Sequence, residues 1–391
     1  MAAPGSGLVA VGCPTGPAVL DQLLPALAAA LDGSGPAIVP VPDGQPGRAV
    51  LAMAAPDEPL EPVGSGWVAL IVPTSGSTGQ PRGALLTNTA LMASAAATHR
   101  RLGGTGSWLL CLPTTHIAGL QVLARSLAAG TTPVCQELAG GFTADGFVAA
   151  AGSLPIATRR YTSLVPTQLD RLLADPAATD ALSGFDAVLL GGAAAPATLV
   201  ERAGSAGVRT VLTYGMSETC GGCVYDGVPL DGVGVDVGES GRIRLSGAVL
   251  FSGYRRDPDA TAAVLHEGVL TTTDLGNFDT AGALTVRGRA DSVIRTGGES
   301  INPEQVERVL TEVNGVHDAV VVGLPDEQWG QRVVALVVAP DGLDRDRVRA
   351  LVAQRLGRAA VPRQILEVDQ LPRLGIGKPD RAAARELAGR L

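Results

Sequence analysis

Residues 68–83 (VALIVPTSGSTGQPRG) join an apolar run to a loop rich in glycine, serine and threonine. The run VALIV (68–72) is short and continuously apolar, which is typical of a buried strand. In the loop, glycines permit tight turns, and backbone amides and hydroxyls can donate hydrogen bonds to a polyphosphate. The loop is not a Walker motif, because it lacks the Gly-Lys-Ser/Thr ending. The stretch therefore predicts a strand leading into a phosphate-binding loop, with an ordinary linker as the alternative.

Short apolar runs alternate with helical patterns from about Val50 to Thr219. Strand-like runs occupy 107–113, 161–166 and 185–192, and helix-like stretches occupy 87–102, 119–130, 167–173 and 196–204. Thr87 or Asn88 is suited to cap the first of these helices, and Gly130 to end the second. Such alternation predicts an α/β fold with helix-covered, mainly parallel sheets.

The pattern changes twice in the second half of the chain. After Gly222, short β-type runs at 241–247, 268–276 and 282–289 predict a small barrel or an antiparallel sheet. From about Asp291, helices and strands alternate again, with Asn302 and Pro303 opening a helix. A chain of 391 residues also exceeds the usual size of one core. We expect an N-terminal domain over 1–289, with a β-rich subdomain at about 223–289, and a small mobile α+β domain over 290–391.

Composition and charge argue against several classes of partner. A formal net charge of −8 disfavours nucleic acid and acidic membrane surfaces. The N-terminus has no basic segment typical of a secretory signal, and no apolar run has the length of a spanning helix. We expect a soluble, cytoplasmic protein without stable membrane insertion. The sequence leaves a homo-oligomer open.

Cys220 and Cys223 form a lone Cys-x-x-Cys pair. A zinc site would need two further ligands at suitable spacing, and the four histidines are dispersed. The pair is therefore expected to be small buried side chains, with a redox or metal role as the alternative.

Lys378 is the only lysine among the 30 lysine and arginine residues of the chain. A compact ammonium can donate to several oxygens around one point, whereas a guanidinium is a broad planar fork. We therefore expect Lys378 to have a role that arginine cannot fill. A solvated lysine near the C-terminus is the alternative.

Five segments, in order, resemble the signature sequences of the adenylate-forming superfamily, which comprises acyl-CoA synthetases, peptide-synthetase adenylation domains and luciferases. They are TSGSTGQPRG (74–83), TYGMSET (213–219), TTDLG (272–276), GRADSVIRTGGESINPEQVE (288–307) and GIGKPDR (375–381). The resemblance implies a reaction in two steps. A substrate carboxylate attacks the α-phosphorus of ATP, giving an acyl-adenylate and pyrophosphate, and coenzyme A then displaces AMP to give a thioester.

The resemblance also implies site residues. Polyphosphate contacts are implied for Thr74, Ser75, Gly76, Ser77, Thr78, Gly79 and Arg82, although the family usually has lysine at the position of Arg82. Adenine and ribose contacts are implied for Gly192, Ala193, Tyr214, Gly215, Asp274 and Arg289. Glu218 is the implied Mg²⁺ ligand, Ser217 is implied at the α-phosphate, and Lys378 is implied to bridge the α-phosphate and the substrate carboxylate.

In this family the small domain rotates between the two steps. Asp291 matches the hinge position. Gly297 and Gly298 would then admit the pantetheine arm of coenzyme A, since glycine lets a thin chain pass close to the backbone. A simple hairpin turn is the alternative for these glycines.

Three segments resemble a narrower group, the o-succinylbenzoate–CoA ligases of menaquinone biosynthesis: THIAGLQVLARSL (115–127), TSLVPTQLDRLL (162–173) and TYGMSETCGGCVYDG (213–227). His116 would line the acyl pocket, or else cap a helix. Arg125 lies in a mostly apolar helical stretch and would hold the second carboxylate of an aromatic dicarboxylic acid, or else form an internal salt bridge. Only about 67 residues precede the first signature strand, which predicts a shortened first subdomain.

Other functions stay open at this point. They are another aryl- or acyl-CoA synthetase, an adenylation domain that loads a carrier protein, and a nucleotide-binding module without catalysis.

Overall fold

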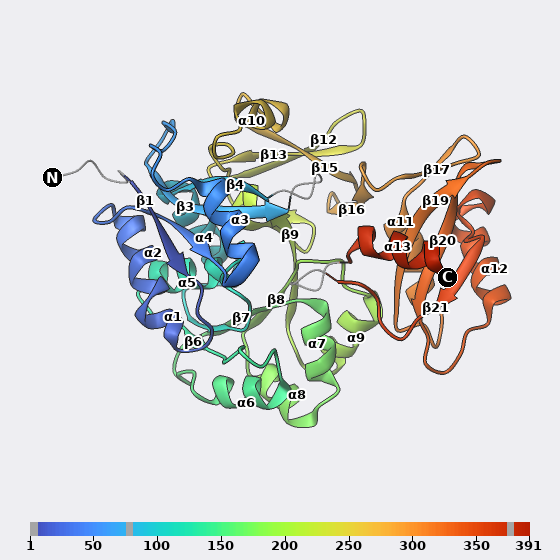
Figure 1. Cartoon of the computed structure of the whole chain (residues 1–391). Coiled ribbons are helices and arrows are strands. Elements are labelled where there is room, and N and C mark those ends of the chain that lie inside the picture. Colours follow the sequence, from blue (N-terminus) through green and yellow to red (C-terminus); the bar gives the residue numbers. More distant parts are fainter. Residues whose placement is uncertain (1–6, 76–80, 374–378) are drawn as a thin grey trace. The chain divides into compact units, whose positions relative to one another are not determined.

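The computed structural model describes residues 7–75, 81–373 and 379–391, which form two compact units (Figure 1). The large unit comprises Met1–Ala195, Leu199–Val235 and Arg244–Thr271, and the small unit comprises Pro196–Thr198, Asp236–Ile243 and Thr272–Leu391. The domain boundary expected at 289–290 stays a prediction. The small unit also includes residues 272–289, which precede that boundary. Among the described residues, no helix is long and apolar enough to cross a bilayer.

The first sheet of the large unit has the order β1-β2-β3-β4. Its strands are β1 (Leu8–Gly12), β2 (Ala37–Val41), β3 (Val68–Ser75) and β4 (Pro81–Thr87). β1 to β3 are parallel, whereas β4 is antiparallel to β3, a strand that the sequence patterns did not indicate. The accompanying helices are α1 (Ala18–Asp21), α2 (Leu23–Asp32), α3 (Gly44–Ala54) and α4 (Asn88–Leu102). Thr87 caps α4 by accepting a hydrogen bond from the Ala90 amide at 3.1 Å, as predicted.

The second sheet has the order β11-β10-β9-β8-β7-β5-β6. Its strands are β5 (Ser107–Leu110), β6 (Val134–Cys135), β7 (Arg160–Leu164), β8 (Ala187–Leu190), β9 (Thr210–Met216), β10 (Gly221–Tyr225) and β11 (Val228–Pro229). The strands from β6 to β9 are parallel and β10 and β11 are antiparallel, so the predicted mainly parallel sheet is confirmed. The helices are α5 (Ile117–Ala129), α6 (Ala144–Gly152), α7 (Pro166–Leu173), α8 (Pro176–Ser183) and α9 (Ala197–Ser205).

The third sheet contains the β-type runs that follow Gly222. Its order is β12-β13-β15-β14, with β16 paired to β15. The elements are β12 (Val233–Val237), β13 (Arg242–Gly247), α10 (Pro258–Val264), β14 (Leu265–His266), β15 (Val269–Phe278) and β16 (Leu284–Arg289). The pairs β14–β15 and β15–β16 are antiparallel, which agrees with the expectation from the sequence.

The fourth sheet, in the small unit, has the order β18-β17-β20-β19, with β21 paired to β20. Its elements are β17 (Ile294–Thr296), β18 (Glu299–Ile301), α11 (Pro303–Thr311), β19 (Asp318–Asp326), β20 (Gly330–Val338), α12 (Arg345–Leu356), β21 (Gln364–Glu367) and α13 (Arg381–Arg390). Alternate residues of β19 enter different cores: Val321 packs with Val306 of α11 and Val348 of α12, whereas Val322 packs with Ala384 of α13. Because both faces are covered, the strand is apolar throughout its centre.

Candidate active site

The loop predicted to bind phosphate connects the two strands of the β3–β4 hairpin. In its register Thr74 lies opposite Arg82, and the Thr74 hydroxyl donates to the Arg82 carbonyl at 3.3 Å. The phosphate contacts predicted for Gly76, Ser77, Thr78 and Gly79 lie outside the described residues. Because β3 and β4 are antiparallel, the last residue of β3 and the first residue of β4 lie side by side at the same end of the hairpin.

Arg82, at the end of this loop, contacts two residues that the sequence did not single out. Its Nε lies 3.3 Å from an oxygen of Asp257, and its guanidinium lies 5.7 Å from the centre of the Tyr254 ring. The Tyr254 hydroxyl donates to Oε1 of Glu218 at 2.7 Å, and both burial and the Glu218 charge raise the Tyr254 pKa. Tyr254 thus joins the base of the phosphate loop to the predicted metal ligand.

Ser217 and Glu218 lie in a short turn between β9 and β10. The Thr219 hydroxyl closes the turn, since it accepts from the Met216 amide at 2.9 Å and donates to the Gly221 carbonyl at 2.7 Å. At Gly215, a Cβ atom would collide with the Gly221 carbonyl, so the close approach of the two strands requires glycine.

The predicted adenine contacts come from two neighbouring parallel strands. Gly192 and Ala193 follow β8, and Tyr214 lies near the end of β9, which pairs with β8. Carboxyl ends of adjacent parallel strands meet at one edge of a sheet, where ligands of open α/β folds bind. The sheet therefore places these three residues at the same edge.

Helix α5 runs from His116 past the turn that holds Ser217 and Glu218. His116 occupies the N-cap position, without a capping hydrogen bond from its side chain. Further along the helix, Gln121 donates to the Cys220 carbonyl at 2.6 Å. Arg125 lies four residues after Gln121 and therefore on the same face of α5, whereas His116 lies at the start of the helix and about half a turn around its axis from Arg125.

Arg125 is 3% exposed and has an unusual environment. Its Nη2 donates to the Tyr225 hydroxyl at 3.3 Å, and its guanidinium lies 5.1 Å from the centre of the Trp108 ring. Its buried Nε has no hydrogen-bond partner, and no carboxylate in the described part of the chain forms an ion pair with it. Burial lowers its pKa. The internal salt bridge considered from the sequence is therefore absent from this part of the chain.

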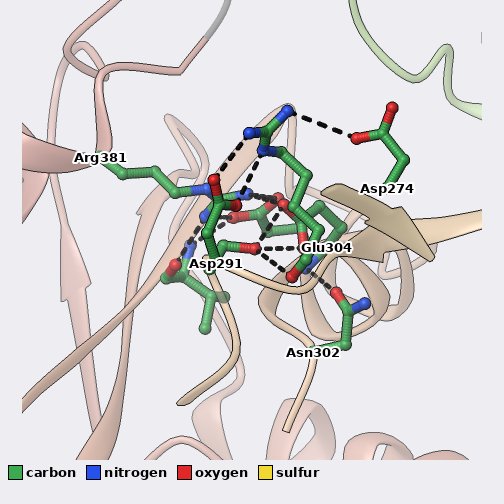
Figure 2. A network of polar contacts seen from close by, with 9 residues as sticks. Asp274, Asp291, Asn302, Glu304 and Arg381 are labelled. Carbon is green, nitrogen blue, oxygen red and sulfur yellow. Dashed lines mark hydrogen bonds and ion pairs between the residues drawn. The ribbon is translucent and has the colours of Figure 1, made fainter. Parts of the chain in front are cut away.

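The predicted ribose and hinge residues come together in the small unit (Figure 2). Arg289 is paired with Asp274 in the β15–β16 register, and their side chains lie 3.4 Å apart. The other side of the Arg289 guanidinium donates to both oxygens of Asp291, at 2.9 and 2.7 Å. These hydrogen bonds raise the Arg289 pKa.

The same network reaches the helix that follows Lys378 in the chain. The Ser292 hydroxyl donates to Glu304 at 3.1 Å, and Arg381 contacts Glu304 at 3.1 Å (Figure 2). Lys378 itself lies outside the described residues. Arg381 belongs to a quoted motif, but its contacts could not be read from the sequence.

Gly297 and Gly298 form the two-residue turn of the β17–β18 hairpin, with φ values of +58° and +82°. Two successive left-handed residues strongly favour glycine. This turn is the alternative noted above, and the role of the two glycines in admitting coenzyme A stays a prediction.

Cys220 and Cys223 are both buried, and burial raises their pKa values, that of Cys223 to about 12. Thiols of this kind are poor nucleophiles and poor metal ligands. Among the described residues, no group of three or more His, Cys, Asp or Glu side chains could hold a metal ion.

Comparison with known proteins places this geometry in a family. The model of the AMP-binding enzyme family matches residues 18–255, and that of the AMP-binding enzyme C-terminal domain matches residues 305–378. The chain belongs to the AMP-binding enzyme family. The adenylate-forming resemblance stated from the five motifs is thereby confirmed.

Relatives within this family include two curated proteins and a solved structure. A probable 2-succinylbenzoate–CoA ligase of Mycobacterium tuberculosis is 49% identical over 94% of this chain and 95% of its own length. An indoleacetate–CoA ligase of Aromatoleum aromaticum is 34% identical over 88% of this chain and 72% of its own length. The o-succinylbenzoate CoA synthetase of Bacillus subtilis, solved with its acyl-adenylate intermediate, has a TM-score of 0.73 and 26% identity over 93% of this chain and 81% of its own.

Proposed function

We propose that this chain is an ATP-dependent acid–thiol ligase that adenylates o-succinylbenzoate and transfers the acyl group to coenzyme A, in the cytoplasm, as a step of menaquinone biosynthesis. The 49% identity to a probable 2-succinylbenzoate–CoA ligase, which extends over nearly the full length of both chains, supports this assignment. The likeness to a solved o-succinylbenzoate CoA synthetase supports it independently.

The structural observation that carries the proposal is the contrast between two buried arginines. Arg255 is 4% exposed and donates to four backbone carbonyls and to Glu61, at distances of 2.7 to 3.1 Å. Arg125 is equally buried, but it donates one hydrogen bond, to the Tyr225 hydroxyl, and otherwise lies over the Trp108 ring. An uncompensated buried charge is costly, so Arg125 calls for an anion. The ring carboxylate of o-succinylbenzoate supplies one.

Adenylation requires a carboxylate to approach a triphosphate, and preorganised donors and cations lower that barrier. In our proposal the succinyl carboxylate attacks the α-phosphorus beside Ser217, and pyrophosphate leaves toward the β3–β4 loop. Lys378 bridges the attacking oxygen and the α-phosphate. Asp274 and Arg289 bind the ribose, and Gly192, Ala193 and Tyr214 surround the adenine.

Glu218 is suited to a Mg²⁺ ion held mainly by the phosphates. Mg²⁺ is usually bound by one or two carboxylates together with substrate phosphates and water. Tyr254 donates to Oε1 of Glu218, which leaves Oε2 for the ion and fixes the direction in which that oxygen points. The ion would neutralise charge on the departing pyrophosphate.

Thioester formation follows in the second step. The thiolate of coenzyme A attacks the acyl carbon of the adenylate, and AMP leaves. We propose that rotation about Asp291 brings Gly297 and Gly298 to the pantetheine arm for this step.

A screen of carboxylic acids for ATP-dependent pyrophosphate release tests the assignment. We expect o-succinylbenzoate to be the preferred acid, ahead of benzoate, indoleacetate and 4-phenyl-4-oxobutanoate, which lacks the ring carboxylate. Preference for indoleacetate would instead indicate the activity named for the Aromatoleum relative. Transfer to a purified carrier protein, with free coenzyme A inactive, would identify a carrier-loading domain.

A further inference from the structure

Cys220 has a backbone conformation that is uncommon for a residue with a side chain. Its φ and ψ angles are +50° and +41°, in the left-handed region. Of the five non-glycine residues with positive φ in the described part of the chain, it alone is buried. Such a conformation costs free energy and persists only where the surrounding structure enforces it. Cys220 therefore marks a point at which the fold constrains its own backbone.

Two buried side chains hold the carbonyl of Cys220. Gln121 of α5 donates to it through Nε2 at 2.6 Å, and the Ser94 hydroxyl of α4 donates to it at 3.1 Å. The two residues are 1% and 0% exposed. A buried carbonyl that lost its donors would be left unpaired, which is costly. The two hydrogen bonds therefore stabilise the direction in which this carbonyl points, and with it the left-handed conformation.

The constrained residue lies directly after the turn that contains Ser217 and Glu218. The Cys220 amide donates to the Ser217 carbonyl at 3.1 Å, so the turn and Cys220 are joined by backbone pairing. On its other side, Gly221 also has a positive φ, of +89°, and a Cβ atom there would lie 3.2 Å from Cγ of Gln121. Helix α5 thus packs closely against the end of the turn. A switch of Cys220 to the right-handed conformation would rotate its carbonyl away from both donors and redirect the chain between Glu218 and β10.

We propose that Gln121 and Ser94 are positioning residues for adenylation. By holding the Cys220 carbonyl, they fix the turn that presents Ser217 and Glu218 to the nucleotide. The inference rests on the proposed function, in which Glu218 is the Mg²⁺ ligand. Groups that orient a metal ligand tune the affinity of the site although they do not touch the ion. A ligand that is oriented on folding also loses no orientational freedom when the nucleotide binds.

The test measures ATP binding by calorimetry without any acid, in excess Mg²⁺ and in EDTA. In the parent we expect Mg²⁺ to strengthen ATP binding. In Gln121→Met, which keeps the length of the side chain but removes its donor, we expect this strengthening to fall about tenfold, with metal-free binding within about twofold of the parent. Ser94→Ala removes only the longer of the two hydrogen bonds, so its effect should have the same sign and be smaller. The maximal rate of adenylation should fall in the same order.

Thr162→Val is the matched control. The Thr162 hydroxyl is also buried and donates to a backbone carbonyl, that of Leu109, at 3.0 Å. Neither residue belongs to the proposed site. We expect this variant to melt at a lower temperature than the parent, as Ser94→Ala does, and to keep the full Mg²⁺ effect on ATP binding. The control thus separates the loss of a buried hydrogen bond from the loss of orientation at Glu218.

Cys220→Gly in the Gln121→Met background gives a second, independent test. Glycine adopts the left-handed conformation without steric cost, whereas cysteine needs the donors to hold it there. The double variant should recover most of the Mg²⁺ effect lost in Gln121→Met, although no hydrogen bond is restored. A role limited to stabilising the core predicts no recovery, because the glycine removes a further buried side chain.

Three results overturn the proposal: an unchanged Mg²⁺ effect in both Gln121→Met and Ser94→Ala, an equal loss in Thr162→Val, or no recovery in the double variant. If the variants bind ATP as expected but the parent does not adenylate o-succinylbenzoate, the choice of acid in the proposed function is wrong and the positioning role stands.

Discussion

Arg289 and Asp291 form a two-pronged ion pair in which the Arg289 guanidinium donates to both Asp291 oxygens, at 2.9 and 2.7 Å (Figure 2). The pair joins the residue expected at the ribose to the residue expected at the hinge. Arg289 is half exposed, so the pair itself adds little stability. In the proposed function, the Arg289 side chain would therefore take part both in ribose binding and in the contact with the hinge residue.

Asp291→Pro should separate the two half-reactions. Proline fixes φ near −65° and restricts rotation at this position. We expect adenylate formation to stay largely intact and thioester formation to fall strongly, measured by pyrophosphate release and by conversion of preformed adenylate. Asp291→Asn removes the charge but keeps the backbone freedom, and should affect thioester formation far less. If both half-reactions fell together in Asp291→Pro, the residue would be structural and not a pivot.

Lys378→Arg should fail in adenylation nearly as badly as Lys378→Ala, because the requirement is for a compact donor and not for charge alone. Loss of a transition-state donor typically costs about 10²–10³ in rate. Thioester formation from preformed acyl-adenylate should be spared in both variants. Near-normal adenylation by Lys378→Arg would refute the role inferred from the single lysine.

Arg125→Ala should weaken use of o-succinylbenzoate by about tenfold to a few hundredfold in kcat/KM, since a charge-assisted hydrogen bond to a partly buried anion is worth roughly 1.5–3 kcal/mol. The comparison acid is 4-phenyl-4-oxobutanoate. It should be a poor substrate of the parent and lose little more in the variant. If the variant discriminated between the two acids as sharply as the parent, Arg125 would not contact the ring carboxylate.

Tyr254→Phe should raise the Mg²⁺ concentration needed for half-maximal adenylation by about tenfold, because Glu218 loses the donor that orients it. The aromatic ring beneath Arg82 is retained. Tyr161→Phe is the matched control: its hydroxyl is also hydrogen-bonded, to the Gly104 carbonyl at 3.0 Å, but touches no proposed site residue. A Mg²⁺ titration that was the same in Tyr254→Phe, Tyr161→Phe and the parent would contradict this role.

His99 should make the fold sensitive to acid. Burial, together with the positive charge of Arg125, lowers its pKa from 6.5 to about 4, and its Nε2 accepts from Trp108 at 3.3 Å. The unfolded chain binds this proton near pH 6.5 and the folded chain only near pH 4, so the stabilisation is complete above pH 6.5 and is lost as the pH falls toward 4.

Thermal melting at pH 7 and pH 4.5 measures this effect. We expect the parent to lose roughly 2 kcal/mol more stability than His99→Gln over this interval, since glutamine can accept from Trp108 but does not titrate. The difference between the two proteins removes the contribution of the carboxylates that also titrate. Parallel losses would show that His99 is not the group responsible.

The sequence by itself determined the elements whose causes are local. The apolar run 68–72 became β3, Thr87 capped α4, and Gly130 ended α5 with φ of +66°. Each of these depends on neighbours within a few positions along the chain, which a sequence displays directly. The five motifs likewise indicated the family, because their order and spacing are properties of the chain.

Only the tertiary structure decided which side chains meet. Glu218 and Tyr254 are 36 positions apart, and Arg125 and Tyr225 are 100 apart. The sequence left Arg125 between an internal ion pair and a ligand contact. The packing of α5 against β10 and β5 placed Tyr225 and Trp108 beside it, and no carboxylate among the described residues forms an ion pair with it. Arg82 likewise received Asp257 as a partner through the pairing of distant segments. Contacts of this kind depend on how whole elements pack together, and no local pattern of residues records that packing.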